Sequence, residues 1–559
     1  MDIAGKNLFV KALKNEGVDT IFAYPGGVIT DLLDEIEKDG SIRIVLPRHE
    51  QALVHEAEGY ARATGKVGVC LVTSGPGATN TVTAITDAFL DSIPIVCFTG
   101  QVSLPLIGND AFQEVDTIGI SRNITKWGIT VRRREDMGHI IKEAFYVAKT
   151  GKPGPVIIDL PKDIQVSSGD SEYPSEVNIR GYKPNEGVHV GQLKKAWKTL
   201  KNAERPIILA GGGVNNARAD EELTAFAEKT GVPVVTTVMG RGAIPTSHPL
   251  YFGNAGMHGA YACNLAIKEC DVLFSIGTRF NDRITGDLND FAPNAQIVHI
   301  DIDSASISRN VVVNVPVVSD AKVALEKLNE WAAKINTEDW IKEIKAWDSE
   351  YPLEMPNDVG LTPQAIMRGI NEVFHESFIT TDVGQHQMWA AQFIELDKKR
   401  HMITSGGLGT MGFGFPAAIG AKVGLPDTPV ICVTGDGSFQ MNLQEMATAN
   451  TEDTPVVICL LNNEVLGMVR QMQNLFYGKR YVATDLKKAD DAYVPDFMKL
   501  AEAYGAKGIR VTQREEIIPA LKEAAENTDS CTLVEFMIDK DEVVLPMVKG
   551  GNSTSDMIL

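Results

Sequence analysis

Two short polar motifs in the last third of the sequence could bind a metal ion and a phosphate. Gly435, Asp436 and Gly437 follow the apolar run VICVT, and Asn463 ends the run VVICLLNN, 27 positions after Asp436. Two parallel strands joined by a helical crossover would bring these residues to one carboxyl edge of a sheet, where α/β proteins bind ligands. A carboxylate and an amide oxygen suit Mg²⁺, and the free N–H groups of a helix starting near Ser438 suit a phosphate.

Each motif alone is most simply an ordinary turn or strand end. Together, GDG, the spacing and NN form the binding motif of thiamine diphosphate enzymes, a superfamily that this sequence resembles. The resemblance implies thiamine diphosphate and Mg²⁺ as cofactors, with the metal held by Asp436, Asn463 and Val465. It also implies that the thiamine cofactor is contacted by Asn80, Gln385, His386, Gly409, Met411, Gly435, Gly437, Ser438 and Met468.

A candidate acid for activating this cofactor lies near the N-terminus. Glu50 comes shortly after the strand-like run IRIVLP and opens the helical pattern EQALVHEAEGYARATG. By itself, a glutamate in the first turn of a helix most simply interacts with the positive end of the helix dipole. The catalytic glutamate of thiamine diphosphate enzymes occupies this position and faces the aminopyrimidine ring, so the resemblance assigns that role to Glu50.

Longer strings narrow the resemblance to the catalytic subunits of the acetohydroxyacid synthase (acetolactate synthase) family. These strings include AFQEVDTIGISRNITKW, GNAGMHGAYACN, FSIGTRFNDRITG, GGLGTMGFGFPAAIGA and VRQMQNLFYGKRY, and the likeness covers essentially all 559 residues. It implies that catalysis involves Gly27, Glu50, Phe112, Gln113, Arg283 and Met472. A guanidinium such as that of Arg283 suits bidentate binding of a 2-oxo acid carboxylate, although most arginines form surface salt bridges instead.

The reaction implied by this resemblance joins two 2-oxo acids. Pyruvate loses CO₂ on thiamine diphosphate, which acts as the electron sink, and the hydroxyethyl carbanion attacks a second pyruvate or 2-oxobutyrate. The products, 2-acetolactate and 2-aceto-2-hydroxybutyrate, lead to branched-chain amino acids. Three alternatives stay open: a flavin-dependent pyruvate oxidase, an FAD-independent catabolic acetolactate synthase, and an inactive binding subunit. The last would not require Glu50, Asp436 and Asn463 together.

The middle of the chain suggests a second cofactor. The stretch RPIILAGGGVNNARADEELTAFAEKTGVPVV reads as a βαβ unit with three glycines at the turn, which by itself is weak evidence for a nucleotide because it is not G-x-G-x-x-G. The resemblance implies a largely structural FAD here. Its contacts would come from Lys152, Gly211, Gly212, His258, Arg279, Asn281, Asp301, Ile302 and Asp320.

Three positions depart from the family pattern. Met472 stands where family members usually carry Trp, and we expect the smaller, flexible side chain to reduce the preference for 2-oxobutyrate over pyruvate. We also expect herbicides that stack on the Trp to bind poorly. The string FNDR replaces the usual FDDR, and Lys152 replaces a common arginine near FAD.

The elements that must position these residues form an α/β protein. Short apolar runs alternate with helical patterns along the whole chain, which is typical of parallel sheets. Polar stretches at 167–187 and at MPNDVGLTP read as linkers. We therefore expect three doubly wound parallel-sheet domains: an N-terminal pyrimidine-binding domain at 1–180, a central FAD-binding-like domain at 188–345, and a C-terminal domain for diphosphate and Mg²⁺ at 358–559.

Composition excludes several classes of partner. The net charge of −20 disfavours nucleic acids and anionic membranes, and no apolar run reaches the roughly 20 residues of a membrane span. The seven scattered cysteines read as reduced core residues, and the N-terminus lacks a targeting pattern, which indicates a cytoplasmic protein. The resemblance implies a homodimer or homotetramer, with sites between subunits, and leaves open a small regulatory subunit.

Overall fold

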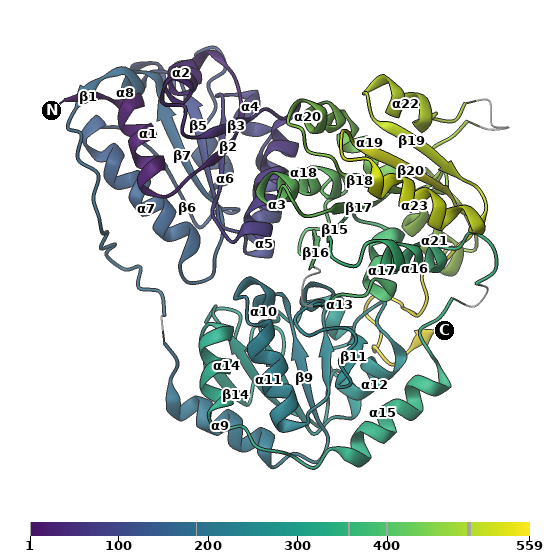
Figure 1. The fold of residues 1–559 in the computed structure, drawn as a ribbon. Coiled ribbons are helices and arrows are strands. Elements are labelled where there is room, and N and C mark those ends of the chain that lie inside the picture. Colours follow the sequence, from purple (N-terminus) through teal and green to yellow (C-terminus); the bar gives the residue numbers. More distant parts are fainter. Residues whose placement is uncertain (1, 186, 356–357, 398–400, 489–492) are drawn as a thin grey trace.

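The computed structural model describes residues 2–185, 187–355, 358–397, 401–488 and 493–559. Three six-stranded parallel sheets follow one another along the chain (Figure 1). This architecture confirms the expected α/β class with three parallel sheets. Residues 186 and 356–357, within the two predicted linkers, lie outside the described residues.

The first sheet comes from the N-terminal third of the chain. Its strands lie in the order β3 (Arg43–Val45), β2 (Thr20–Tyr24), β4 (Gly68–Val72), β5 (Ile95–Gln101), β7 (Val156–Pro161) and β6 (Trp127–Thr130). Its helices are α1 (Gly5–Asn15), α2 (Thr30–Asp39), α3 (Glu50–Thr64), α4 (Pro76–Thr79), α5 (Val82–Asp91), α6 (Thr117–Ser121), α7 (Met137–Lys149) and α8 (Lys162–Val166). Alternate residues of β4 enter different cores, with Leu71 in one and Cys70 in the other, so both faces of the sheet are covered.

The third sheet repeats this plan near the C-terminus. Its strands lie in the order β16 (His401–Thr404), β15 (Phe378–Thr381), β17 (Val430–Gly435), β18 (Val457–Asn462), β20 (Thr532–Met537) and β19 (Lys507–Val511). Its helices are α16 (Pro363–Val373), α17 (Gln385–Phe393), α18 (Gly414–Gly424), α19 (Asp436–Asn442), α20 (Met446–Thr451), α21 (Gly467–Phe476), α22 (Phe497–Ala503) and α23 (Ile517–Glu526). Relative to their sequence order, the strands of the first and third sheets are arranged identically.

The middle sheet has a different order. Its strands are β11 (Tyr251–Asn254), β10 (Val234–Thr236), β9 (Pro206–Ala210), β12 (Val272–Ile276), β13 (Gln296–Asp301) and β14 (Val315–Val318). Its helices are α9 (Val190–Lys201), α10 (Gly212–Asn216), α11 (Asp220–Thr230), α12 (Tyr261–Glu269), α13 (Asp282–Thr285), α14 (Ala321–Asn329) and α15 (Glu338–Glu350). The order reverses beside β9, as in dinucleotide-binding folds, and such a reversal opens a crevice at the carboxyl ends of the strands.

The first and third sheets are joined by α3 and α18, which pack closely (Figure 1). A Cβ added to Gly59 would lie 2.0 Å from the Ala417 carbonyl oxygen, and one added to Gly420 would lie 1.8 Å from that of Glu56. One apolar core therefore runs between the two sheets, containing Cys70 from the first and Cys432 from the third. Glu50 begins α3 and so lies at the end of this rigid helix pair.

The first predicted linker is partly structured. Within 167–187, β8 (Ser168–Gly169) pairs antiparallel with β1 (Ile3–Ala4), and the side chains of Tyr173, Ile179 and Tyr182 pack against the first core. The sequence did not predict this packing, because the stretch is mostly polar and the three apolar side chains are spaced too widely to form a strand or helix pattern.

Two further expectations concern the whole chain. All seven cysteines are buried free thiols, as predicted. No helix within the described ranges is long and apolar enough to cross a membrane.

Candidate active site

The carboxyl edge of the third sheet brings the two polar motifs together, as predicted. β17 and β18 are parallel neighbours, Gly435 pairs with Leu461, and Asn463 directly follows β18. The crossover differs from the expected single helix near Ser438, because α19 begins at Asp436 and the 3₁₀ turn η5 (Leu443–Glu445) separates it from α20. The sequence pattern located the helix but not this break.

Close glycine contacts gather further predicted residues at the same edge. A Cβ on Gly435 would lie 2.8 Å from Nδ1 of His386. At Gly467 it would lie 1.9 Å from Oε1 of Gln385 and 2.7 Å from the side-chain nitrogen of Asn463, and at Gly437 it would lie 3.7 Å from Cε of Met411. The hydroxyl of Ser438 donates to the Val383 carbonyl over 2.9 Å. Gln385, His386, Met411 and Asn463 therefore converge with the GDG motif.

The donor set at this edge suits a divalent cation. Asp436 is 3% exposed, and burial raises the pKa of its carboxyl group to about 7 although backbone N–H groups, including that of Asn463, oppose this shift. The side-chain oxygen of Asn463 accepts the N–H of Val465 over 3.2 Å, which orients the amide. A bound cation would stabilise the buried carboxylate, and oxygen ligands are those that Mg²⁺ prefers.

His386 offers a polar group beside this donor set. Its ring is buried, and Nε2 has no hydrogen-bond partner among the described residues. Burial lowers the pKa of the imidazole to about 3, so the ring is neutral and its Nε2–H tautomer can donate a hydrogen bond. An unpaired buried donor costs free energy, which a phosphate oxygen would recover.

Glu50 lies at the carboxyl edge of the first sheet, at the first position of α3. Its side chain is largely buried, and Oε2 accepts a hydrogen bond from the side-chain amide of Asn80 over 2.9 Å. A Cβ on Gly77, in the short helix α4 after β4, would lie 3.5 Å from the other carboxyl oxygen. Gly27, in the loop after β2, is exposed at the same edge.

Phe112 and Gln113 lie in a long loop after β5. Phe112 is 88% exposed, and the backbone of Gln113, at a φ of 57°, lies against Gly75 of the loop after β4. Gln101 fixes the far end of this loop by donating to the Val115 carbonyl over 3.0 Å. The loop thus presents a large aromatic side chain outward from the edge that holds Glu50.

A cavity of about 1360 Å³ lies among the three sheets, at the carboxyl edge of the middle one. It exceeds the roughly 300–1,000 Å³ of ordinary small-molecule pockets and so has room for an extended dinucleotide. The predicted site residues that line it are Lys152, Gly212, His258, Arg279, Asn281, Arg283, Asp301, Ile302, Asp320, Gly409, Met468 and Met472. Gly211 does not line it, because it packs against the turn after β12, where an added Cβ would lie 2.2 Å from the Gly277 oxygen.

The polar lining fits a nucleotide in part. Oδ1 of Asn254 is buried without a hydrogen-bond partner among the described residues. Asp320 is already engaged as the N-cap of α14, accepting the N–H of Lys322 over 2.8 Å. Lys152 reaches from the first sheet's layer to Asp303 over 3.4 Å, and so closes one side of the cavity.

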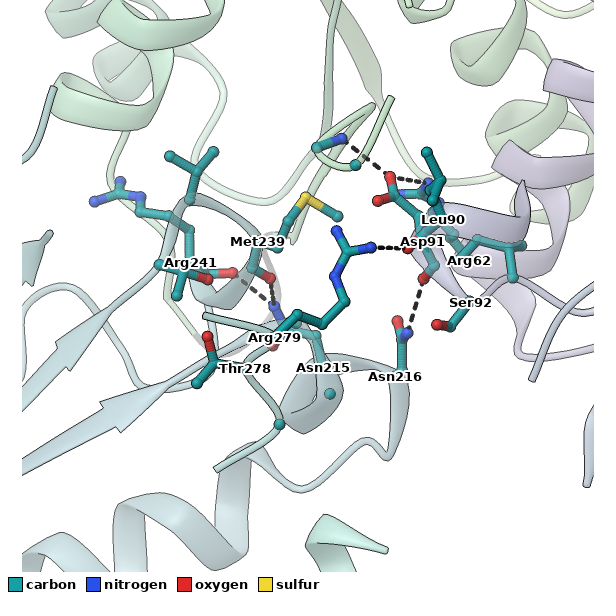
Figure 2. Close-up of a pocket in the computed structure, with 18 of the residues that line it drawn as sticks. Arg62, Leu90, Asp91, Ser92, Asn215, Asn216, Met239, Arg241, Thr278 and Arg279 are labelled. Atoms are coloured by element: carbon teal, nitrogen blue, oxygen red, sulfur yellow. Dashed lines mark hydrogen bonds and ion pairs between the residues drawn. The ribbon is translucent and has the colours of Figure 1, made fainter. Parts of the chain in front are cut away.

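Three polar side chains that line this cavity, Asn215, Asn216 and Arg241, were not predicted from the sequence, and each donates a hydrogen bond to a main-chain carbonyl (Figure 2). The guanidinium of Arg279, itself predicted, donates to the Leu90 carbonyl over 2.6 Å, and Asn216 donates to the Asp91 carbonyl over 3.2 Å. Asn215 donates to the carbonyls of both Met239 and Arg241 over 2.9 Å. The third, Arg241, donates to the Tyr251 hydroxyl over 2.9 Å and to the Ile394 carbonyl. The sequence signal for Asn215 and Asn216 was the NN pair directly after GGGV.

Met468, Met472 and Arg283 also line the cavity. Met468 and Met472 are one helical turn apart on α21 and therefore share a face. The Arg283 side chain is 60% exposed, and its guanidinium is 3.7 Å from Asp282 and 3.8 Å from the Met257 sulfur. Its weak ion pair leaves the guanidinium able to bind an anionic ligand.

Comparison with known proteins agrees with this geometry. Three models of the thiamine pyrophosphate enzyme match: the N-terminal TPP binding domain at 3–120, the central domain at 193–328 and the C-terminal TPP binding domain at 382–536. Acetolactate synthase large subunits of Haemophilus influenzae and Corynebacterium glutamicum are 45% and 46% identical, over 100% and 99% of this chain and 98% and 90% of theirs. A probable large subunit of Methanocaldococcus jannaschii is 47% identical, over 99% of this chain and 95% of its own. The chain therefore belongs to the thiamine pyrophosphate enzymes and, among them, to the family of acetolactate synthase large subunits.

Proposed function

We propose that this protein synthesises 2-acetolactate from two molecules of pyruvate, and 2-aceto-2-hydroxybutyrate when 2-oxobutyrate is the acceptor. The observation that carries the proposal is the convergence of Asp436, Asn463, His386 and Met411 at one sheet edge, in a chain whose full-length relatives are named acetolactate synthases. When bound, thiamine diphosphate supplies an acidic thiazolium carbon that can accept the electrons released by decarboxylation.

Different residues would bind the metal, bind the diphosphate and transfer the proton. Asp436, Asn463 and the Val465 carbonyl would hold Mg²⁺, and Nε2 of His386 would donate to the diphosphate. Glu50 would exchange a proton with the aminopyrimidine, and Asn80 orients its carboxyl group through the 2.9 Å hydrogen bond. A carboxyl group that is held within hydrogen-bond distance of the proton to be transferred can act as a general acid or base.

The substrate would bind where Arg283 and Met472 line the cavity. Arg283 would bind the carboxylate of the 2-oxo acid by a charge-assisted pair, and Met472 would contact the side chain of the acceptor. FAD would occupy the cavity along the middle sheet, between Lys152, Arg279 and Asp301. In the single chain, Glu50 and Asp436 do not line this cavity, so we further propose a homodimer or homotetramer whose active sites combine the first sheet of one subunit with the third sheet of another.

The names of the relatives describe large subunits, and on that basis we also propose a small regulatory subunit as partner.

Product analysis tests this function. Purified protein is incubated with pyruvate, with and without 2-oxobutyrate, while thiamine diphosphate, Mg²⁺ and FAD are omitted in turn. Acetolactate formation without oxygen uptake, lost when the thiamine cofactor or Mg²⁺ is omitted, is the expected result. Acetate or acetyl phosphate with oxygen uptake would instead indicate a flavin-dependent pyruvate oxidase, and full activity in protein stripped of FAD would indicate the FAD-independent synthase.

A further inference from the structure

A buried carboxylate from the third sheet's layer holds the main chain that leads into Glu50. Glu445, at the end of η5, is fully buried, and its two oxygens accept the backbone N–H of Arg48 over 2.9 and 3.2 Å. Arg48 lies only two residues before Glu50. Because Glu445 binds the backbone, the contact fixes the path of the chain and does not depend on the side chain at position 48.

A second carboxylate binds the same segment. Oε1 of Glu452 accepts the backbone N–H of Leu46 over 3.2 Å, and the guanidinium of Arg48 donates to the hydroxyl of Thr451 over 3.1 Å. The turn between β3 and α3 is thus bound along its length by one stretch of the third sheet's layer.

The carboxylate of Glu445 is itself held in place. The hydroxyl of Thr448 and the side-chain amide of Gln444 both donate to it, the amide over 3.3 Å. Its geometry therefore does not depend on the Arg48 contact alone. Burial raises the pKa of Glu445, whereas its bonds from the Thr448 hydroxyl and the Arg48 N–H oppose that shift.

The two ends of Glu50 are then fixed by different parts of the molecule. Asn80 of the first sheet's layer binds its carboxyl group, and Glu445 binds the main chain before it. A catalytic group has to be held within about 0.5 Å of its productive position, and a misplacement of about 1 Å can cost a hundredfold in rate. We propose that Glu445 is a positioning residue for Glu50, acting across the contact between the first and third sheets. This role rests on the proposed function, since it requires Glu50 to face the cofactor.

A positioning role can be separated from a stabilising one by measuring proton transfer directly. Exchange of the C2 proton of bound thiamine diphosphate, followed by NMR in heavy water after acid quenching, reports the step in which Glu50 takes part. Glu445→Met removes the acceptor while preserving length and apolar packing, and Glu445→Gln retains an acceptor oxygen for the Arg48 N–H. Glu16→Met is the matched control, because Glu16 is a 3%-exposed carboxylate that binds Lys142 and Tyr173 elsewhere in the first sheet's layer.

We expect Glu445→Met to slow C2 exchange about tenfold and Glu445→Gln to slow it less than about threefold, since small displacements of a catalytic group already reduce rate. Glu16→Met should exchange at the wild-type rate despite lower thermal stability. If Glu445→Met does not fold, Thr448→Val, which removes a bond that orients Glu445, should slow exchange in the same sense.

Wild-type exchange in Glu445→Met or Thr448→Val would overturn the proposal, as would equal slowing in Glu445→Met and Glu16→Met. Glu50→Gln is measured in parallel. If that variant also exchanges at the wild-type rate, the role of Glu50 and the proposed function fail, whereas slow exchange in Glu50→Gln with normal exchange in Glu445→Met refutes the positioning role alone.

Discussion

Asn80 and Glu50 are joined by a 2.9 Å hydrogen bond between the side-chain amide and Oε2, which links the end of α4 to the start of α3. The bond leaves Oε1 of Glu50 to face Gly77 of α4. One carboxyl oxygen is thus oriented and the other is left for proton transfer.

Glu50→Gln should therefore lower turnover by about a hundredfold or more, which is the usual contribution of a positioned general acid or base. The amide preserves shape and can still bond to Asn80, so the melting temperature should stay near that of the wild type. Steady-state kinetics with pyruvate and a thermal scan check both statements. Full activity in Glu50→Gln would contradict the assignment.

Asp436→Asn should raise the Mg²⁺ concentration needed for half-maximal activity at least about tenfold, because a neutral amide replaces the buried carboxylate ligand. Magnesium titrations of chelator-treated enzyme measure this shift. Asp427→Asn is the control, since Asp427 is exposed in the turn that leads into the same strand, and its titration curve should match the wild type. Equal magnesium requirements in both variants would count against the metal site.

Met472→Trp should increase the preference for 2-oxobutyrate over pyruvate as acceptor, by about tenfold, because a larger apolar surface discriminates an extra methylene by about 10–200-fold. The test is a competition assay that measures both products from mixed substrates. A strong 2-oxobutyrate preference in the wild-type protein would contradict the role expected for Met472.

Glu56→Met should stabilise the protein at alkaline pH. Glu56 is fully buried on α3, where its carboxyl group lies against that of Glu445. Burial and the charges of Glu445 and Glu452 raise its pKa well above 4.5, and Arg48 opposes this only in part. The folded state therefore binds a proton that the unfolded state releases, so the free energy of unfolding falls as pH rises above about 4.5.

Urea unfolding at about pH 5.5 and pH 8.5 checks this sign. The variant should gain about 1–3 kcal/mol over the wild type at the higher pH, where it removes a buried carboxyl group that faces the carboxylates of Glu445 and Glu452, and less at the lower pH. Glu16→Met, which breaks the 2.6 Å pair with Lys142, should lose stability instead. A Glu56→Met protein less stable than the wild type at the higher pH would show that the carboxyl group is favourable there.

Local patterns sufficed to predict the alternating strands and helices and the meeting of Asp436 with Asn463, because parallel neighbours joined by a crossover leave little choice of geometry. The cavity contacts of Asn215 and Asn216 were not predicted, since they depend on how the middle sheet sits against the first. The roles of Glu445 and Glu56 were not predicted either, because they also depend on contacts between sheets. Their partners lie about four hundred positions away in sequence, brought close by the α3–α18 packing.

The most direct test of the account is subunit complementation. Glu50→Gln and Asp436→Asn proteins are unfolded together, refolded as a mixture and assayed for acetolactate at a magnesium concentration too low to support activity of Asp436→Asn alone. If the two groups act on one cofactor from different subunits, half of the random dimers contain one intact site, and activity should return to about a quarter of the wild-type level. No recovery of activity in verified mixed dimers would contradict the shared site.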